Sequence, residues 1–211
     1  DNKAYPVMIH DHNVSLLHNG KILKHIQLER ITRKKYDHRL PFYLYELLAK
    51  EDMLGDEETD LVFVDHVIGR AFQNNRGNIR FEAPLTNELK NIPEAGICYY
   101  LDRRKEAYAV NHELAHVYSN LPFTGEFTEN SLHVHFDGGA SKSNFSEWVF
   151  KNGRMNLLEY HWDLNYLSSL FNSNALNFSI IGAKQPDQNS MPGKFMGYAS
   201  YGTYDPRIEQ W

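Results

Sequence analysis

A pair of histidines spaced one helical turn apart is the sharpest chemical feature of this sequence. His112 and His116 lie in residues 111–116 (Asn-His-Glu-Leu-Ala-His). Residues four positions apart share one face of a helix, where two imidazoles can bind the same metal ion. Asn111 is a favourable N-cap, so we expect a helix from His112 to about Asn120. The helix dipole disfavours the imidazolium form of His112 and leaves a lone pair for a metal.

A second group of polar residues follows in a predicted strand over Leu132–Phe136. In an alternating strand, His133, His135 and Asp137 point to the same side. The two residues after the aspartate are Gly138-Gly139. Glycines at a strand end let the backbone approach a phosphate or a metal-bound nucleotide closely. Asp137 is therefore another metal-competent group, at the beginning of the element after the helix, although a plain hairpin turn would also explain this motif alone.

The same histidine run matches the H-E-x-x-H pattern of zinc metallopeptidases, in which Glu113 would be the general base. The metzincin extension requires Gly and His downstream, where this chain has Ser119 and Pro122. Other zinc peptidases need a further Glu on a downstream helix, but the next glutamates lie in a predicted linker over 124–130. The peptidase interpretation stays open as an alternative. The two interpretations differ over Asp137, which would be a metal ligand in the first and has no role in a peptidase.

Two further stretches could bind a ligand. Residues 29–38 carry four basic side chains within six positions, followed by Asp and His. A solvated charged face is the usual explanation, and the functional one is an anion site in which Arg33 and Lys35 bind oxygens. Residues 192–202 carry three glycines among apolar residues. Glycines in such a setting indicate a helix packed around a ligand cleft.

Composition excludes several classes of protein. The chain has 211 residues, of which 42% are hydrophobic, and a net charge of −5. A disordered or fibrous chain is excluded, and binding of nucleic acid through bulk charge is not expected. Cys98 is the single cysteine, which excludes an internal disulfide and favours a reducing, cytoplasmic compartment. The longest uncharged stretch, 164–183, is rich in Asn and Ser, so no membrane span is expected.

The first part of the chain predicts an α/β organisation that opens with an antiparallel meander. Its strands are Pro6–Ile9, Val14–His18 and Ile22–Leu28, and Asn19-Gly20 signals a type I′ hairpin. Pro41 suits the first turn of a helix over Phe42–Lys50. The remaining elements are a buried strand over Leu61–Val67, a polar loop with an uncertain helix over 69–91, and a strand over Ala107–Val110.

After the predicted linker the opening pattern recurs. Strands are predicted over Leu132–Phe136, Ser146–Phe150 and Met155–Tyr160, with an Asn152-Gly153 hairpin before the third. In both copies a turn containing an aspartate separates the first two strands. This indicates an internal repeat, although two ordinary meanders would look the same. Helical character is then expected over Leu164–Phe171.

Together, these motifs resemble the N-terminal region of the bacterial O-carbamoyltransferases, which modify nodulation factors and aminoglycoside or cephalosporin antibiotics. Five motifs occur in the family's order. The family's His-Asp-Ala-Ser corresponds to residues 10–15, its Glu-Glu-Arg-x-Thr-Arg-x-Lys-His-Asp to 28–37, its Asn-His-His-x-Ala-His to 111–116, its Asp-Gly-x-Gly to 137–139, and its Gly-Lys-x-Met-Gly-x-Ala-x-Tyr-Gly to 193–202. Departures include Tyr36 in place of a His, and Glu113, which is interpreted as an incidental replacement.

The resemblance implies an actin-like ATPase fold, built from two ribonuclease-H-like halves with mixed sheets, β-meanders and flanking helices. Residues 1–127 would be the first half, and 128–211 the beginning of an incomplete second half. It also implies a domain that binds a nucleotide and a divalent metal, with iron first and zinc or manganese as alternatives. This domain would transfer a carbamoyl group from carbamoyladenylate, which derives from ATP, to an acceptor hydroxyl.

The resemblance also assigns residues to roles. The metal ligands would be His112, His116 and Asp137, and the catalytic residues would be His10 and Lys35. Arg33 and Lys35 would bind oxygens of the substrate, and Gly138 and Gly139 would bind phosphate.

The expected partners are carbamoyladenylate, a small-molecule acceptor with a sugar- or antibiotic-like hydroxyl, and the remaining C-terminal part of the same enzyme. We expect a fragment that is not fully active alone. An apolar surface meant for the missing part would favour homo-oligomers. A non-catalytic nucleotide-binding domain of the same fold is a further alternative.

Overall fold

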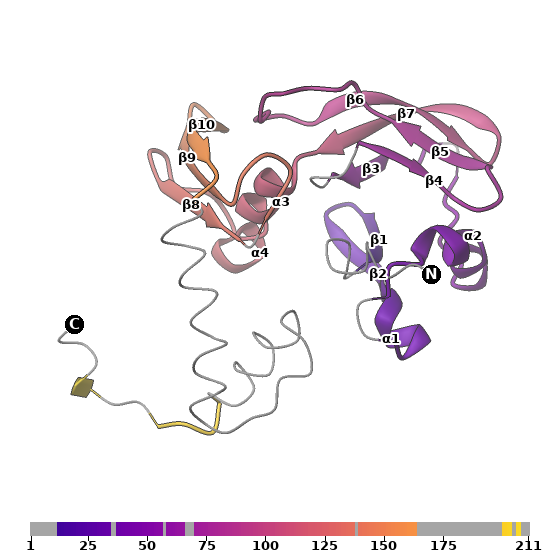
Figure 1. Ribbon diagram of the computed structural model, residues 1–211, viewed down its shortest axis with the longest axis horizontal. Coiled ribbons are helices and arrows are strands. Elements are labelled where there is room, and N and C mark those ends of the chain that lie inside the picture. Colours follow the sequence, from indigo (N-terminus) through magenta and orange to yellow (C-terminus); the bar gives the residue numbers. More distant parts are fainter. Residues whose placement is uncertain are drawn as a thin grey trace.

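A computed structural model describes residues 12–34, 37–56, 58–65, 70–137 and 139–163, with two short pieces at 200–203 and 206–207. Helices and strands of both kinds are present, so the predicted α/β class is confirmed (Figure 1). The predicted strand over Pro6–Ile9 and the helical stretch over Leu164–Phe171 lie outside the described residues. Among the residues described, no helix is long and apolar enough to cross a membrane.

The opening hairpin forms where the sequence predicts it. Strand β1 (Asn13–His18) pairs antiparallel with β2 (Lys21–Gln27). Asn19 and Gly20 both adopt positive φ, at 48° and 72°, as a type I′ turn requires. Asn tolerates this conformation and Gly adopts it without a steric penalty, so these two residues set the register of the hairpin.

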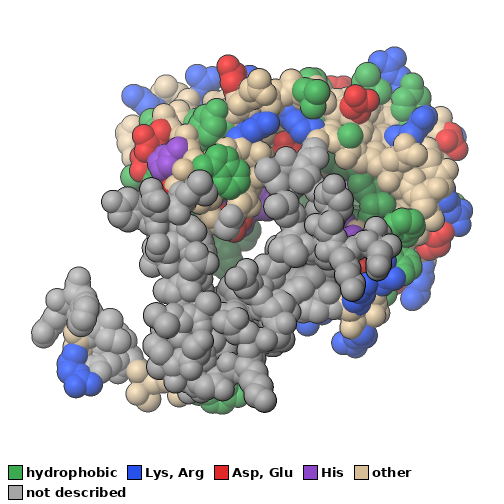
Figure 2. Space-filling model, in the orientation of Figure 1, with side chains coloured by type: hydrophobic (Ala, Val, Ile, Leu, Met, Phe, Trp, Pro, Cys, Tyr) green, Lys and Arg blue, Asp and Glu red, His purple; other side chains and the backbone are tan. Residues whose placement is uncertain are grey.

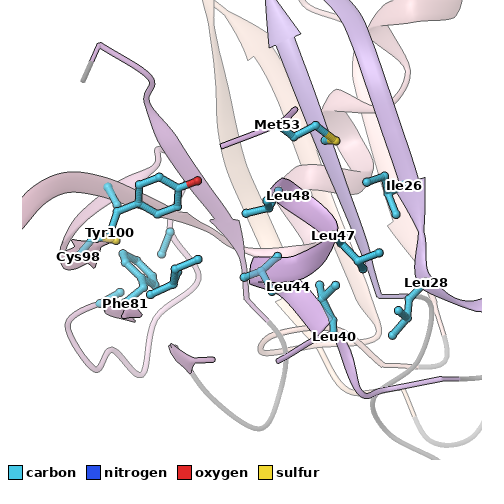
Figure 3. Close-up of a cluster of buried hydrophobic side chains, with 14 residues drawn as sticks. Ile26, Leu28, Leu40, Leu44, Leu47, Leu48, Met53, Phe81, Cys98 and Tyr100 are labelled. Carbon is cyan, nitrogen blue, oxygen red and sulfur yellow. The ribbon is translucent and has the colours of Figure 1, made fainter. Parts of the chain in front are cut away.

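Two helices follow the hairpin. The short helix α1 (Leu28–Thr32) was not predicted and lies in the charged stretch. Helix α2 (Leu40–Lys50) agrees with the predicted helix and has Pro41 in its first turn. Its buried leucines lie between Ile26 of β2 and Leu28 of α1 on one side and the side chains of the larger sheet on the other, as Figure 3 shows. The leucines that form this central layer are Leu40, Leu44, Leu47 and Leu48.

A five-stranded sheet lies on the other side of α2, with strand order β3-β7-β6-β5-β4. Strand β3 runs parallel to β7, and the other pairs are antiparallel. The bounds are β3 (Leu61–Val64), β4 (Ala71–Gln73), β5 (Ile79–Glu82), β6 (Glu94–Tyr100) and β7 (Arg103–Val110).

Two predictions about this sheet are wrong. Over its described residues, 61–65, the predicted strand is not buried, because β3 is at the edge of the described sheet and Val62 and Val64 are more than half exposed. The stretch 69–91 is not a loop with an uncertain helix, since it contains β4 and β5. Ile79 and Phe81 alternate with exposed Arg80 and Glu82. The two-residue period of this strand was too short to stand out among polar neighbours.

The second meander is confirmed. It consists of β8 (Leu132–Phe136), β9 (Phe145–Lys151) and β10 (Arg154–His161), in the order β10-β9-β8. Asn152 and Gly153 have positive φ at 56° and 72°, like the turn of the first hairpin. The predicted recurrence of hairpins therefore holds for the described strands. The division into two halves at residues 127 and 128 stays a prediction.

Helices α3 (His112–Tyr118) and α4 (Leu121–Thr124) lie beside this meander (Figure 1). Leu114 and Val117 of α3 pack with Trp148 and Met155 in a second core cluster. Phe127 packs against the same cluster. The predicted linker over 124–130 is thus wrong in part, because its one aromatic side chain anchors it to the fold.

Candidate metal site between α3 and β8

The two histidines converge because α3 begins where the sequence predicts. Asn111 precedes the helix with extended backbone, although its side chain donates to the carbonyl of Lys90 (2.9 Å) rather than capping the helix. On the exposed side of α3, the Nε2 atoms of His112 and His116 lie 2.8 Å apart. Their side chains are 25% and 47% exposed, so both rings remain accessible from solvent.

Asp137 joins this pair from the end of β8. Its Oδ2 lies 3.4 Å from Nε2 of His112 and 3.3 Å from Nε2 of His116. Among the described residues, these three form the group of His, Cys, Asp and Glu side chains with metal-ligand spacing. Ligand atoms that each lie about 2.1 Å from one ion are at most about 4.2 Å apart, so the observed spacing fits a shared ion. Two imidazoles and one carboxylate suit zinc, iron and manganese.

Two more histidines of β8 face α3. His133 is partly buried and His135 is buried, in alternation with exposed neighbours, as the predicted strand period requires. Nε2 of His133 bonds to Ser131, whereas the ring of His135 lies 5.1 Å from the ring of His116. Burial, followed by the neighbouring His116, lowers the pKa of His135 to about 4. His135 therefore stays neutral at physiological pH beside the site.

Glu113 does not face the histidine pair. Its side chain is fully buried, and its carboxylate accepts hydrogen bonds from the backbone of residues 141–143. A zincin base must instead reach a metal-bound water. The geometry therefore argues against the peptidase interpretation. It also corrects the interpretation of Glu113 as an incidental replacement, because the carboxylate has a defined set of partners.

A buried polar chain behind the site was not found from the sequence. Ser141 donates its hydroxyl proton to Asp65 and accepts the backbone N–H of His112 at 2.8 Å. Arg70 pairs with Asp65 at 3.0 Å and with Glu94 at 2.6 Å. Burial raises the pKa of Asp65, against the opposing effects of Ser141 and Arg70. These residues are too far apart in sequence for a spacing pattern to reveal them.

With this geometry in hand, comparison with known proteins decides the family. The family model described as carbamoyltransferase N-terminus matches residues 4–210. The chain belongs to the carbamoyltransferase N-terminus family. Searches of curated proteins and of solved structures gave no significant match.

The other residues that the carbamoyltransferase resemblance singled out are placed as follows. His10, Lys35 and Gly138 lie outside the described residues. Gly139 lies near Trp162, whose ring atoms would be 3.4 and 3.5 Å from an added Cβ, which is an ordinary van der Waals contact. Arg33 ends α1 with a φ of 57° and is exposed. Figure 1 shows α1, the helix that Arg33 follows, well apart from α3 and β8.

The surface agrees with a weakly charged chain. On the face in Figure 2, acidic and basic side chains are interspersed over the described residues. No single sign of charge dominates that face, in keeping with the net charge of −5.

Proposed function

We propose that this chain is the N-terminal domain of an enzyme that transfers a carbamoyl group from carbamoyladenylate to an acceptor hydroxyl, at a site that binds a metal and a nucleotide. The convergence of His112, His116 and Asp137 carries the proposal. It occurs in a chain of the carbamoyltransferase N-terminus family, at two of the motifs that resemble the family. The acceptor would be a small molecule with a sugar- or antibiotic-like hydroxyl, and no nucleic acid or membrane partner is proposed.

The metal would be held by Nε2 of His112, Nε2 of His116 and the carboxylate of Asp137. Ferrous iron is the first candidate, and zinc and manganese have compatible chemistry. When bound, a divalent metal supplies Lewis acidity toward a phosphate oxygen of the adenylate. The partly exposed imidazoles leave room for a ligand on the solvent side of α3.

The proposed reaction forms a bond between the acceptor oxygen and the carbamoyl carbon and breaks the bond from that carbon to the phosphate oxygen of AMP. His10 would accept the hydroxyl proton, and Lys35 would balance charge on the carbamoyl oxygens. Arg33 is proposed for substrate oxygens and Gly138-Gly139 for phosphate. In the full-length enzyme, His10→Asn should lower kcat by about 10²- to 10⁴-fold with an unchanged circular dichroism spectrum. Normal turnover by the folded variant would exclude this role.

The proposed fold is the actin-like ATPase fold with two ribonuclease-H-like halves, of which residues 128–211 begin the second. The antiparallel meander, the parallel β3–β7 pair and the flanking helices support this assignment. The proposal includes a cytoplasmic location, further parts of the same enzyme as partners, and self-association through apolar surface.

Metal titration of the anaerobically purified chain tests the proposal. Wild type is compared with His116→Ala and Asp137→Ala, and His133→Ala serves as a control because its imidazole bonds to Ser131 instead. We expect both ligand variants to lose the metal and the control to keep it. If Asp137→Ala binds the metal as tightly as wild type, the aspartate is not a ligand, and the peptidase alternative would be favoured again. No binding by wild type would contradict a metal site formed by this chain alone.

A further inference from the structure

Glu113 makes an unusual set of contacts for a carboxylate on a helix. Its Oε1 accepts the backbone N–H of Lys142 at 2.7 Å and of Ser143 at 2.9 Å. The Ser143 hydroxyl donates to the same oxygen at 3.0 Å, and the backbone N–H of Ser141 lies 3.2 Å from Oε2. Three successive backbone N–H groups that converge on one point form a cradle for an anion. Here the anion is a side chain of the same molecule.

The loop that forms this cradle is the one that follows Asp137. The backbone N–H of Asp137 bonds to the carbonyl of Asn144 at 2.9 Å, so the two ends of the loop are closed on each other. Inside the loop, Ala140 bonds to the carbonyl of Ser143 at 2.9 Å. These bonds connect the backbone of residues 141–143 to the backbone that carries Asp137.

A second anchor holds the loop from the other side. The Ser141 hydroxyl bonds both to the first N–H of α3 and to Asp65, which pairs with Arg70. Ser141 is 5% exposed and Asp65 is 7% exposed. The loop is thus fixed between α3, which carries the two histidines, and the five-stranded sheet. Glu113 and Ser141 both tie Asp137 to the helix opposite it.

We propose that the Glu113 carboxylate is a built-in anion that fills the backbone cradle of residues 141–143 and thereby positions Asp137 against His112 and His116. Glu113 is a positioning residue, since it acts through the loop and does not face the site itself. This role rests on the proposed metal site. Because the three N–H groups are bonded to Glu113, they are not donors for a nucleotide phosphate. A bound nucleotide would then have to form its phosphate hydrogen bonds with other groups.

Two measurements on Glu113→Gln test the inference, with Glu159→Gln as the matched control. Glu159 is an exposed carboxylate on β10, so its replacement removes the same charge away from the loop. The first measurement is Co²⁺ affinity, followed by absorption spectroscopy. The second is the rate of trypsin cleavage after Lys142 without metal, followed by mass spectrometry. The bond that trypsin cuts there leads to the N–H of Ser143, which is bonded to Glu113.

We expect Glu113→Gln to lower Co²⁺ affinity by about ten- to hundredfold, as loss of groups that orient metal ligands does. Cleavage after Lys142 should be at least about tenfold faster, because the loop opens locally. Glu159→Gln should match wild type in both. Wild-type Co²⁺ affinity and wild-type cleavage in Glu113→Gln would overturn the inference. Absence of Co²⁺ binding by wild type would instead overturn the proposed metal site, and the positioning role with it.

A small anion added to Glu113→Ala tests whether the loop requires a bound anion or only the packing of the Glu113 side chain. In Glu113→Ala, formate should restore protection at Lys142 and raise Co²⁺ affinity, whereas chloride at the same ionic strength should not. Equal effects of the two anions would overturn the role of the carboxylate. Where the Glu113 variants do not fold, Ser143→Ala decides, because it removes one donor and keeps the backbone N–H. Unchanged cleavage in that variant would contradict the inference.

Discussion

Two aspartates in motifs that resemble the family lie in opposite environments. Asp37 is buried, and the Arg39 guanidinium donates hydrogen bonds to both of its carboxylate oxygens, at 2.8 and 2.6 Å. Asp137 has a side chain that is 35% exposed and faces two imidazoles. A carboxylate saturated by a guanidinium fork stabilises the fold, whereas a partly exposed one beside two imidazoles is suited to bind a cation. The same residue type therefore has a structural role in one region and a candidate chemical role in the other.

The comparison also separates the two candidate ligand regions. Part of the charged stretch 29–38 serves the fold, since Arg39 next to it holds the pKa of Asp37 well below its usual range and Thr32 adds a side-chain hydrogen bond. In the region of α3 and β8, the residues that serve the fold are different ones, Glu113 and Ser141. That division leaves His112, His116 and Asp137 on the accessible side.

The largest expected difference between the two aspartates is in metal affinity. Asp137→Asn should weaken Co²⁺ binding at least about 100-fold, which exceeds the effect of most groups that only orient ligands. Asp37→Asn should leave Co²⁺ affinity within about twofold, provided that the variant is folded. Isothermal titration of both variants checks this. Equal losses in the two variants would remove the distinction between them.

The sequence predicted the elements that carry the candidate ligands better than the sheet behind them. A spacing of four on a helix and of two on a strand are local patterns, so His112, His116 and Asp137 could be placed on two elements in advance. Asn-Gly turns likewise set both hairpins locally. Whether these elements would meet could not be derived from spacing, and it entered only through the family resemblance.

The parts that could not be predicted depend on contacts between distant residues. Phe81 is buried because it stacks on Phe63, whose ring centroid is 4.3 Å away, although its local sequence is polar. Asp65 and Ser141 are 76 positions apart and meet only in the fold. Glu113 matched a peptidase motif, and only its hydrogen bonds in the fold show that it faces the loop instead.

For the free energy of unfolding, we expect the larger loss in the Asp37 variant and the smaller loss in the Asp137 variant. Asp37→Asn should lower the free energy of unfolding by about 2 kcal/mol, because hydrogen bonds to a charged partner are lost in a buried setting. Asp137→Asn should change the free energy of unfolding much less in the absence of metal. Urea unfolding followed by circular dichroism measures both. A larger loss in Asp137→Asn would mean that the site aspartate also has the structural role.

The dependence of stability on pH gives a smaller, signed effect. The folded pKa of Asp37 is lowered from 3.8, mainly by the hydrogen bonds of Arg39. Its contribution is therefore fully present above the unfolded value and is lost as the pH falls below about 4 toward the folded pKa. One carboxyl contributes at most about 1.4 kcal/mol per pH unit to this slope. Urea unfolding at pH 7, 4 and 3 should show a shallower acid loss in Asp37→Asn, and an unchanged slope would contradict it.

The smallest expected effect concerns the exposed arginine of the charged stretch. Arg33→Ala should shift Tm by less than about 2 °C, because Arg33 lies on the surface at the end of α1. Arg39→Ala should lower Tm more, since it removes the partner of a buried carboxylate. If Arg33 binds substrate oxygens as proposed, its variant should also weaken binding of AMP, measured by titration of the full-length enzyme. If Arg33→Ala shows normal AMP affinity and normal stability, Arg33 does not bind substrate, and the role of this stretch is the structural pairing of Asp37 with Arg39.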